Sequence, residues 1–138
     1  MKKINRILTT QEGFTLVEVL AVLVIVAILA VVAIPKYMNA TEAARNKAAQ
    51  GQIAEVKGRF AQGLGRYMME NNGSVPASGA ALIVAVESYS AGATAGAEAD
   101  FTFSSAAVLK VITITVTVVG TAVLVTPQTG TYDFTNAG

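Results

Sequence analysis

The chain has 138 residues and a formal net charge of +1, and it contains no Cys and no His. A chain of this length forms one modest domain, and without Cys and His it has no disulfides, no thiolate or imidazole nucleophiles and none of the usual zinc ligands. Residues 1–76 carry nine Lys/Arg against five Asp/Glu, whereas residues 77–138 carry one Lys against four Asp/Glu. Neither part has the dense basic patch typical of nucleic-acid binding. We therefore expect no enzyme, catalytic residue, cofactor or metal site, and no specific nucleic-acid partner.

The chain begins with a short basic segment followed by a long apolar run. Residues 1–13 are polar with three Lys/Arg, and residues 14–34 are strongly apolar except for Thr15 and Glu18. A helix of this length covers about 30 Å, enough to span the hydrocarbon core of a bilayer. Because positive charge precedes the run, residues 1–13 are expected in the cytoplasm and the chain after about Lys36 outside it. The expected topology is N-in, C-out across an inner or cytoplasmic membrane.

A basic start before an apolar stretch also describes an ordinary secretory signal. Such a signal has an apolar region of about 7 to 15 residues followed by a small-x-small cleavage site. The run here is longer, and the charged segment behind it, IPKYMNATEAARNKAAQ, has the pattern of a continuing helix. Cleavage after the run and an uncleaved signal anchor remain as alternatives.

Glu18 lies one turn inside the apolar run. A charge among membrane-spanning residues is costly, so it usually marks a function and implies a partner. A simpler interpretation is local, because Thr15 and Glu18 form an S/T-x-x-E capping box in which the Glu satisfies a backbone N–H at the start of the helix. Capping alone gives no reason to place the carboxylate inside the apolar segment, which favours a charged partner.

The segment GFTLVEV places Gly13 directly before Phe14, with Glu18 as the fifth residue of the run and Pro35 as the twenty-second. Over residues 1 to about 60 this pattern resembles type IV pilins and the related pseudopilins of type II secretion. The resemblance implies that a membrane aspartyl peptidase, the prepilin peptidase, cuts between Gly13 and Phe14 and methylates the new amino group of Phe14. The leader 1–13 is then removed and the apolar run is kept.

The implied cleavage supplies the partner for Glu18. It creates a cationic amine on Phe14, and an opposite charge within about 4 to 6 Å favours the ionised carboxylate. Positions 14 and 18 are neighbours on one helix face, so a pair within one chain is possible. The resemblance favours the amine of an adjacent subunit, which makes Phe14 and Glu18 the expected assembly residues.

Residues 36–72 are expected to continue the helix in amphipathic form. Pro35 removes one helical hydrogen bond and clashes with the preceding turn, so it predicts a kink at the end of the transmembrane part, 14–35. A stop is expected at Asn71, Asn72 and Gly73, with Pro76 just beyond. The residues of the apolar stripe recur at spacings of three and four and are expected to cover a sheet. They are Ile53, Val56, Phe60, Leu64 and Tyr67.

Residues 73–138 are expected to form a variable loop and an antiparallel β head, giving an α+β fold. Residues 77–100 are rich in Ala, Gly and Ser and are interpreted as the connection to the sheet. The alternation of Ile/Val with Thr after Lys110 predicts a half-buried strand. TAVLVT predicts a second strand, PQTG a turn and TYDF a short third strand. A meander packed on the helical stripe is the expected arrangement; an exposed hairpin is the alternative.

The resemblance implies a structural subunit of a type IV pilus, a homopolymeric filament for motility, adhesion or DNA uptake that ends on the cell surface. The implied partners are the prepilin peptidase, the pilus assembly platform and the membrane. A pseudopilin of a type II secretion piston is the alternative. Asp133 as the single carboxylate of the tail provides too few ligands for the calcium site that major pseudopilins often have, which favours the pilin.

Two further alternatives are an electron-conducting pilin and a membrane-anchored domain that never polymerises. The first would use aromatic side chains such as Tyr37, Phe60 and Tyr67 along the filament. Packing of these rings in the core is the simpler expectation.

Overall fold

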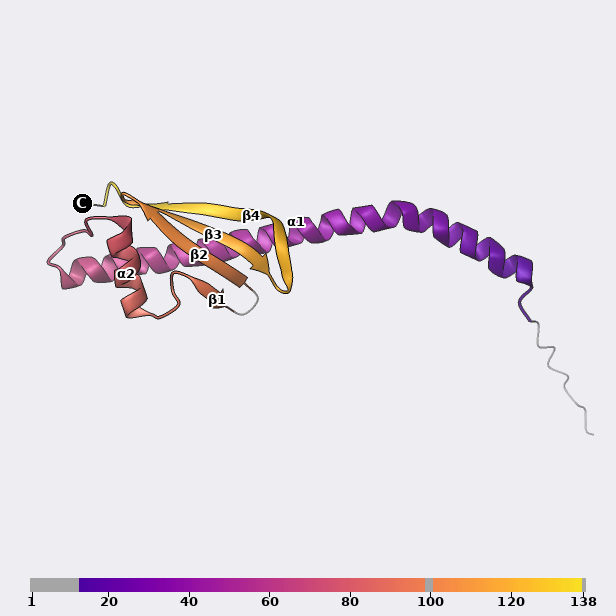
Figure 1. Ribbon diagram of the computed structural model, residues 1–138, viewed down its shortest axis with the longest axis horizontal. Helices are drawn as coiled ribbons and strands as arrows, with labels where there is room; N and C mark the ends of the chain where they lie inside the picture. The colour runs from indigo at the N-terminus through magenta and orange to yellow at the C-terminus, as the bar shows by residue number, and fades with distance from the viewer. Residues whose placement is uncertain (1–12, 99–100, 138) are drawn as a thin grey trace, which may run out of the picture. The chain divides into compact units, whose positions relative to one another are not determined.

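The computed structural model describes residues 13–98 and 101–137. These residues divide into two compact units between Asn39 and Ala40. Figure 1 shows the order of the elements along the chain. They are α1 (Leu16–Glu70), α2 (Gly79–Tyr89), β1 (Gly96–Glu98), β2 (Phe101–Val108), β3 (Val111–Val119) and β4 (Ala122–Asp133). A long N-terminal helix packed on a small antiparallel sheet makes this a pilin-like α+β fold, as expected from the sequence.

The second half of α1 ends where the sequence predicts a stop. Asn72 and Gly73 both have positive φ, 52° and 84°. The Gly73 N–H donates to the Met68 carbonyl at 2.7 Å, and the Asn71 side chain donates to the Tyr67 carbonyl at 2.8 Å. These bonds satisfy carbonyls that the last turn of a helix otherwise leaves without partners.

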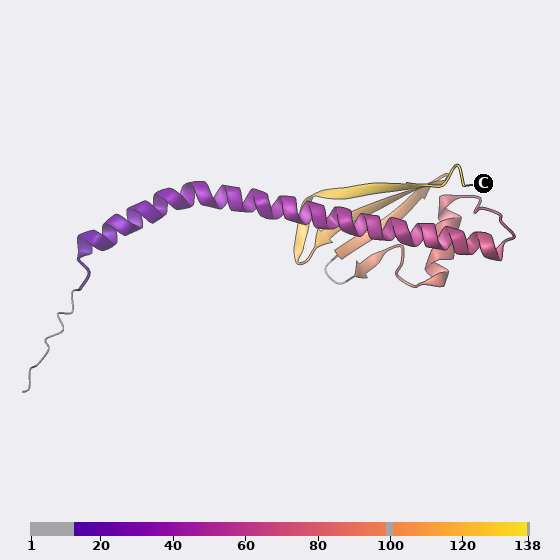
Figure 2. The ribbon, with the colours of Figure 1, turned by 180° about the vertical axis from the view of Figure 1, so that it is seen from behind.

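The sheet is a meander in which each strand pairs antiparallel with the next, in the order β1-β2-β3-β4. Figure 2 shows the second half of α1 running across one face of this sheet. On β3 the predicted alternation is confirmed, because Ile112, Ile114 and Val116 are buried while the threonines between them are partly exposed. The exposed-hairpin alternative is wrong, since the inner face of β3 is covered.

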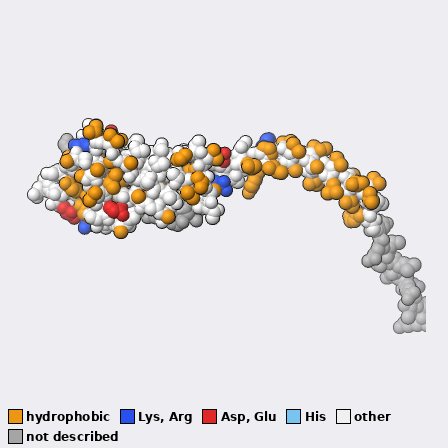
Figure 3. Space-filling view, viewed as in Figure 1, with side chains coloured by type: hydrophobic (Ala, Val, Ile, Leu, Met, Phe, Trp, Pro, Cys, Tyr) orange, Lys and Arg blue, Asp and Glu red, His pale blue; other side chains and the backbone are white. Residues whose placement is uncertain are grey.

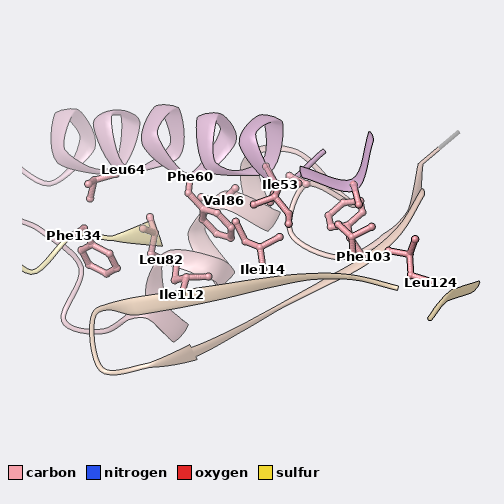
Figure 4. Packing of buried hydrophobic residues seen from close by; sticks show 14 residues of the cluster. Ile53, Phe60, Leu64, Leu82, Val86, Phe103, Ile112, Ile114, Leu124 and Phe134 are labelled. Atoms are coloured by element: carbon pink, nitrogen blue, oxygen red, sulfur yellow. The ribbon is translucent and has the colours of Figure 1, made fainter. Parts of the chain in front are cut away.

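The core lies between α1, α2 and the sheet (Figure 4). Four residues of the predicted stripe, Ile53, Val56, Phe60 and Leu64, are buried, and Tyr67 is half-buried. Helix α1 also contributes Ala49, and the remaining core residues come from α2, the strands and the segments that flank them. They include Leu82, Val86, Phe103, Ile112, Ile114, Val116, Leu124 and Phe134.

Three aromatic rings form a row within this core. The Phe60 ring stacks on Tyr132 with centroids 5.9 Å apart, and Tyr132 stacks on Phe134 at 6.3 Å. Burial raises the pKa of the Tyr132 phenol above its ordinary value. Core packing therefore explains Phe60, but it does not explain Tyr37, which is 73% exposed. Tyr37 directly follows Lys36 at the end of the apolar run, a position typical of interfacial aromatic residues.

The connection 77–100 contains structure that the sequence analysis did not anticipate. Residues Gly79–Tyr89 form α2, whose N-cap Ser78 accepts a hydrogen bond from the Ala81 N–H at 3.2 Å. Residues Gly96–Glu98 form the edge strand β1, and β2 follows where no strand was predicted. An apolar stretch as short as ALIVAVESY fits a helix or a strand equally well by periodicity, and tertiary contacts decide between them.

The predicted turn at PQTG is wrong. Residues 127–130 lie inside β4, which continues in one direction to Asp133. The pairing of β4 with β3 is interrupted instead, because Val123 faces Val118 and Gln128 faces Val116, which leaves residues 124–127 as a bulge. Pro127 has no N–H to donate, so it is tolerated in this unpaired segment.

Helix α2 lies against α1 at Gly63. A Cβ at Gly63 would overlap the Val86 side chain, whereas a Cβ at Gly58 would meet nothing within 4 Å. Near this contact the Arg66 guanidinium lies 4.2 Å from the centre of the Tyr89 ring and donates to Glu70 at 3.0 Å. The Tyr89 hydroxyl also donates to Glu70, at 2.7 Å. The bonds from Tyr89 and Arg66 hold the pKa of Glu70 below its ordinary value.

The loop after α2 is held by the carboxylate of Glu87. It accepts hydrogen bonds from the Gly92 N–H, from the Thr94 N–H at 3.1 Å and from the Thr94 hydroxyl at 2.7 Å. The bond from the Thr94 side chain, followed by that from Gly92, holds the pKa of Glu87 below its ordinary value of 4.5. Three donors from one loop make this carboxylate the centre of the connection between α2 and β1.

Gly63→Ala and Gly58→Ala form a matched pair that tests the contact between α1 and α2. Both substitutions gain about 1 kcal/mol of helix propensity. Only at position 63 does the new methyl enter a packed contact, which costs about 1 to 3 kcal/mol. Urea unfolding of the detergent-solubilised, unassembled protein should show Gly58→Ala stabilised and Gly63→Ala less stable than Gly58→Ala. Equal stability of the two variants would contradict the close approach of the helices.

Glu87→Gln should loosen the loop 90–95. Because the folded pKa of Glu87 is lowered, its contribution to stability is present above the unfolded value near 4.5 and is lost as the pH falls through the folded pKa. Amide hydrogen exchange at Gly92 and Thr94 should therefore be faster in the variant at pH 7, and the difference should disappear as the pH falls through the folded pKa of Glu87, which is lowered from its ordinary value. Ser88→Ala, one position away, is the control. A difference that persists in acid would show that charge is not involved.

Candidate functional site

The peptide bond between Gly13 and Phe14 lies just before α1. Residues 13–15 are not helical, and the Phe14 side chain is 83% exposed. If this bond lay inside the helix, the helix would have to unwind locally before a peptidase could bind the backbone. Because the bond lies before the helix, no unwinding is needed. A Cβ built on Gly13 would meet nothing within 4 Å, so packing among the described residues does not explain the glycine. Close backbone approach by another molecule would explain it.

Thr15 caps the start of α1. Its hydroxyl accepts a hydrogen bond from the Glu18 N–H at 3.3 Å, and its carbonyl accepts from the Val19 N–H at 3.2 Å. One half of the capping box expected from the sequence is therefore formed, the half made by the threonine. It satisfies a backbone donor that the first turn of a helix otherwise leaves without a partner.

The Glu18 carboxylate takes no part in the cap. Among residues 13–98 and 101–137 it has no hydrogen-bond donor and no cation as a partner. Phe14 lies four positions before it, and positions i and i+4 are neighbours on a helix surface. Local structure therefore places Glu18 beside Phe14 and leaves its charge available for another group.

The apolar run surrounds this carboxylate. Figure 3 shows its hydrophobic side chains as an almost continuous surface. By length and composition α1 is able to cross a membrane, and no residue of its most apolar window is buried within the structure. Exposure of about 50% to 80% for so many Leu, Ile and Val side chains indicates an environment of lipid or of other apolar helices. The helix continues through Pro35, and a kink there stays a prediction.

A second candidate is a cavity of about 300 Å³ between α1 and α2, lined on one side by Arg59 and Arg66. Each guanidinium already has a carboxylate partner on its own helix, Arg59 with Glu55 at 2.7 Å and Arg66 with Glu70 at 3.0 Å. Within the described ranges no three Asp or Glu side chains converge as a metal site would require. The Arg66–Tyr89–Glu70 cluster has no signal in the sequence, because only the folding of α2 onto α1 assembles it.

Residues 8–34 match the family model of the prokaryotic N-terminal methylation motif. No curated protein and no solved structure matches the chain. The matched range contains Gly13, Phe14 and Glu18 together with the whole apolar run, residues 14–34. The motif, the long apolar helix and the α+β head together support a type IV pilin or pseudopilin-like precursor with a structural role, anchored in a membrane by its N-terminal helix.

Proposed function

We propose that this chain is the precursor of a type IV pilus subunit. Prepilin peptidase removes residues 1–13 and methylates the amino group of Phe14, and the mature chain polymerises through its apolar helix. One observation carries the proposal: Glu18 has no partner among the described residues, yet lies one turn behind an accessible Gly13–Phe14 bond inside the methylation motif.

Processing follows from the position of this bond relative to the membrane. The leader, which carries three Lys/Arg, stays in the cytoplasm, and the chain beyond Lys36 lies outside. The bond between Gly13 and Phe14 then lies at the cytoplasmic surface, outside the helical hydrogen bonds, where a membrane peptidase reaches it. Cleavage leaves Phe14 as a cationic N-terminus at the start of the lipid-facing helix.

Assembly exchanges lipid contacts for contacts between helices. Four alanines, Ala21, Ala27, Ala30 and Ala33, allow the helices of neighbouring subunits to approach closely. The amine of an incoming Phe14 pairs with Glu18 of a subunit already in the filament, which removes an unpaired charge from an apolar environment. An assembly platform in the membrane extracts the subunit, and a heterologous contact that does not close extends the fibre to the cell surface.

A pseudopilin of a type II secretion piston would share the processing and the helical bundle. Electron microscopy of sheared cell-surface material separates the two. Long filaments of this subunit are expected for the pilus, whereas mature protein that stays in the membrane would favour the pseudopilin.

Intact-mass measurement and N-terminal sequencing of the mature chain test the processing. We expect a chain that starts at Phe14 and carries one additional methyl group. The unprocessed chain, which starts at Met1, should accumulate when the peptidase is absent. A mature protein that starts beyond Pro35, or one that keeps Met1 in cells with active peptidase, would contradict the proposal.

Glu18→Gln tests the charge pair. The cap should persist because the Thr15 hydroxyl supplies it and the Glu18 side chain does not. The variant should insert and lose its leader, and insertion itself should become easier, since a carboxylate in the span costs a few kcal/mol. Mature subunit should nevertheless accumulate in the membrane, because the incoming amine has no counter-charge.

The assay is the ratio of sheared filament to membrane-bound mature subunit. Thr15→Ala is the control, since it removes the cap and keeps the charge. Wild-type filament yield from cleaved Glu18→Gln protein would exclude charge pairing as the docking mechanism.

A further inference from the structure

Two triplets of the chain have the pattern Asn-x-Ser/Thr, the acceptor that N-linked oligosaccharide transferases recognise. One, NAT, begins at Asn39 in the interior of α1, and the other, NGS, begins at Asn72, just after α1 ends. Neither has Pro in the middle, so both satisfy the pattern. The proposed orientation places both outside the cytoplasm, on the side of the membrane where such transfer takes place.

Asn72 lies in an exposed turn. Residues 71–74 are all exposed, and Figure 1 and Figure 2 show this turn at the C-terminal end of α1, outside the sheet. The Asn72 side-chain amide has no hydrogen-bond partner among the residues that the structure describes, whereas the amide of Asn71 donates to the Tyr67 carbonyl. Of the two neighbouring asparagines, the one followed by Gly-Ser is therefore the one whose side-chain nitrogen is available.

The fold uses Asn72 and Gly73 but not the Ser74 hydroxyl. Asn72 and Gly73 both have positive φ, as the helix stop requires. The Ser74 N–H donates to the Asn71 carbonyl at 3.0 Å, a bond that Ala would make equally well. Within the described ranges the Ser74 hydroxyl has no partner. A hydroxyl at this third position is what an Asn-x-Ser/Thr acceptor requires.

The two triplets differ in how easily a transferase can bind them. An acceptor binds in an extended or turn conformation, so a helical segment has to unwind first. At Asn72 only the hydrogen bonds that end α1 have to open, and helix ends open at little cost. Asn39 has helical residues on both sides. It also lies five residues after Ile34, about 8 Å along the helix from the end of the apolar run, so the membrane surface limits access.

The two triplets differ in charge as well. Glu70 lies two positions before Asn72, where bacterial transferases of this class favour a carboxylate, and the corresponding position before Asn39 is uncharged. Hydrogen bonds from Tyr89 and Arg66 hold the pKa of Glu70 below its ordinary value, so the carboxylate beside the turn is ionised at neutral pH.

We propose that Asn72 is a site of N-linked glycosylation. The sugar donor is a lipid-pyrophosphate-linked oligosaccharide. A bond forms between the Asn72 side-chain nitrogen and the anomeric carbon of the sugar, the nitrogen loses a proton, and the lipid pyrophosphate leaves. The proposal rests on the proposed function, because only the N-in, C-out orientation brings the head to the transferase.

A glycan at Asn72 is compatible with assembly. It is bulky and hydrophilic, so it has to stay at the surface. Asn72 follows the C-terminal end of α1, whereas Phe14 and Glu18 lie at the N-terminal end. The sugar therefore leaves the peptidase site and the bundle of apolar helices unhindered.

Peptide mapping of the mature chain from its native cells tests the assignment. Cleavage after Glu70 and Glu87 gives the peptide 71–87, in which Asn71 and Asn72 are the two asparagines. We expect this peptide to carry a sugar mass that fragmentation localises to Asn72. An unmodified peptide 71–87, or a sugar localised to Asn71 or to a serine, would overturn the proposal.

Ser74→Ala and Ser74→Thr form a matched pair. Ser74→Ala keeps Asn72 and the backbone bonds of the helix stop but removes the hydroxyl, so the sugar should be lost completely. Ser74→Thr keeps the triplet and should keep the sugar. Asn39→Gln, the control for the second triplet, should leave the glycan mass of the chain unchanged. A sugar that survives in Ser74→Ala, or one that is lost in Asn39→Gln, would overturn the proposal.

Intact mass and N-terminal sequencing of the same samples separate failure of this proposal from failure of the proposed function. A mature chain that starts at Phe14 and has an unmodified Asn72 would overturn the glycosylation and leave the processing intact. A chain that keeps Met1 in cells with active peptidase would overturn the processing, whether or not Asn72 carries a sugar.

Discussion

A backbone in lipid has to satisfy its hydrogen bonds internally, and the first half of α1 depends on this constraint. An uninterrupted helix does so everywhere except at its ends. At the N-terminal end the Thr15 hydroxyl and carbonyl accept hydrogen bonds from Glu18 and Val19. The cap therefore has more weight here than in a water-exposed helix, and it leaves the Glu18 carboxylate available for a charged partner that arrives only with processing.

The second half of the same helix depends on protein contacts. Its apolar residues form one stripe against the sheet. Its intrinsic helix propensity is lowered by about 1 kcal/mol for each of four glycines, Gly51, Gly58, Gly63 and Gly65. Stability must therefore come from the core. Gly63 is the one of these that contacts α2, where the close approach to Val86 leaves no space for a Cβ. The head and the lipid-facing segment thus obtain their order from different sources.

This division separates the roles of the two parts in the proposed filament. The lipid-facing segment presents a nearly uniform apolar surface with one carboxylate, so Glu18 is the group in it that can distinguish one docking position from another. The head instead packs its apolar residues into a core of its own, so the two parts contribute different kinds of surface to the proposed filament.

The sequence by itself determined the features that depend on local pattern. These are the membrane-length apolar run, the Gly13–Phe14 bond at its start and Glu18 inside it. They also include the apolar stripe of the helix, the stop at Gly73 and the alternating strand after Lys110. The tertiary structure decided the rest. In runs of Ala, Gly, Ser and Val the two faces of a helix or strand differ little in polarity. The sequence pattern therefore does not predict α2, β1 and β2, and packing contacts decide their structure. Pro127 was interpreted as part of a turn, but the core needed Leu124, and a bulge in β4 accommodates both residues.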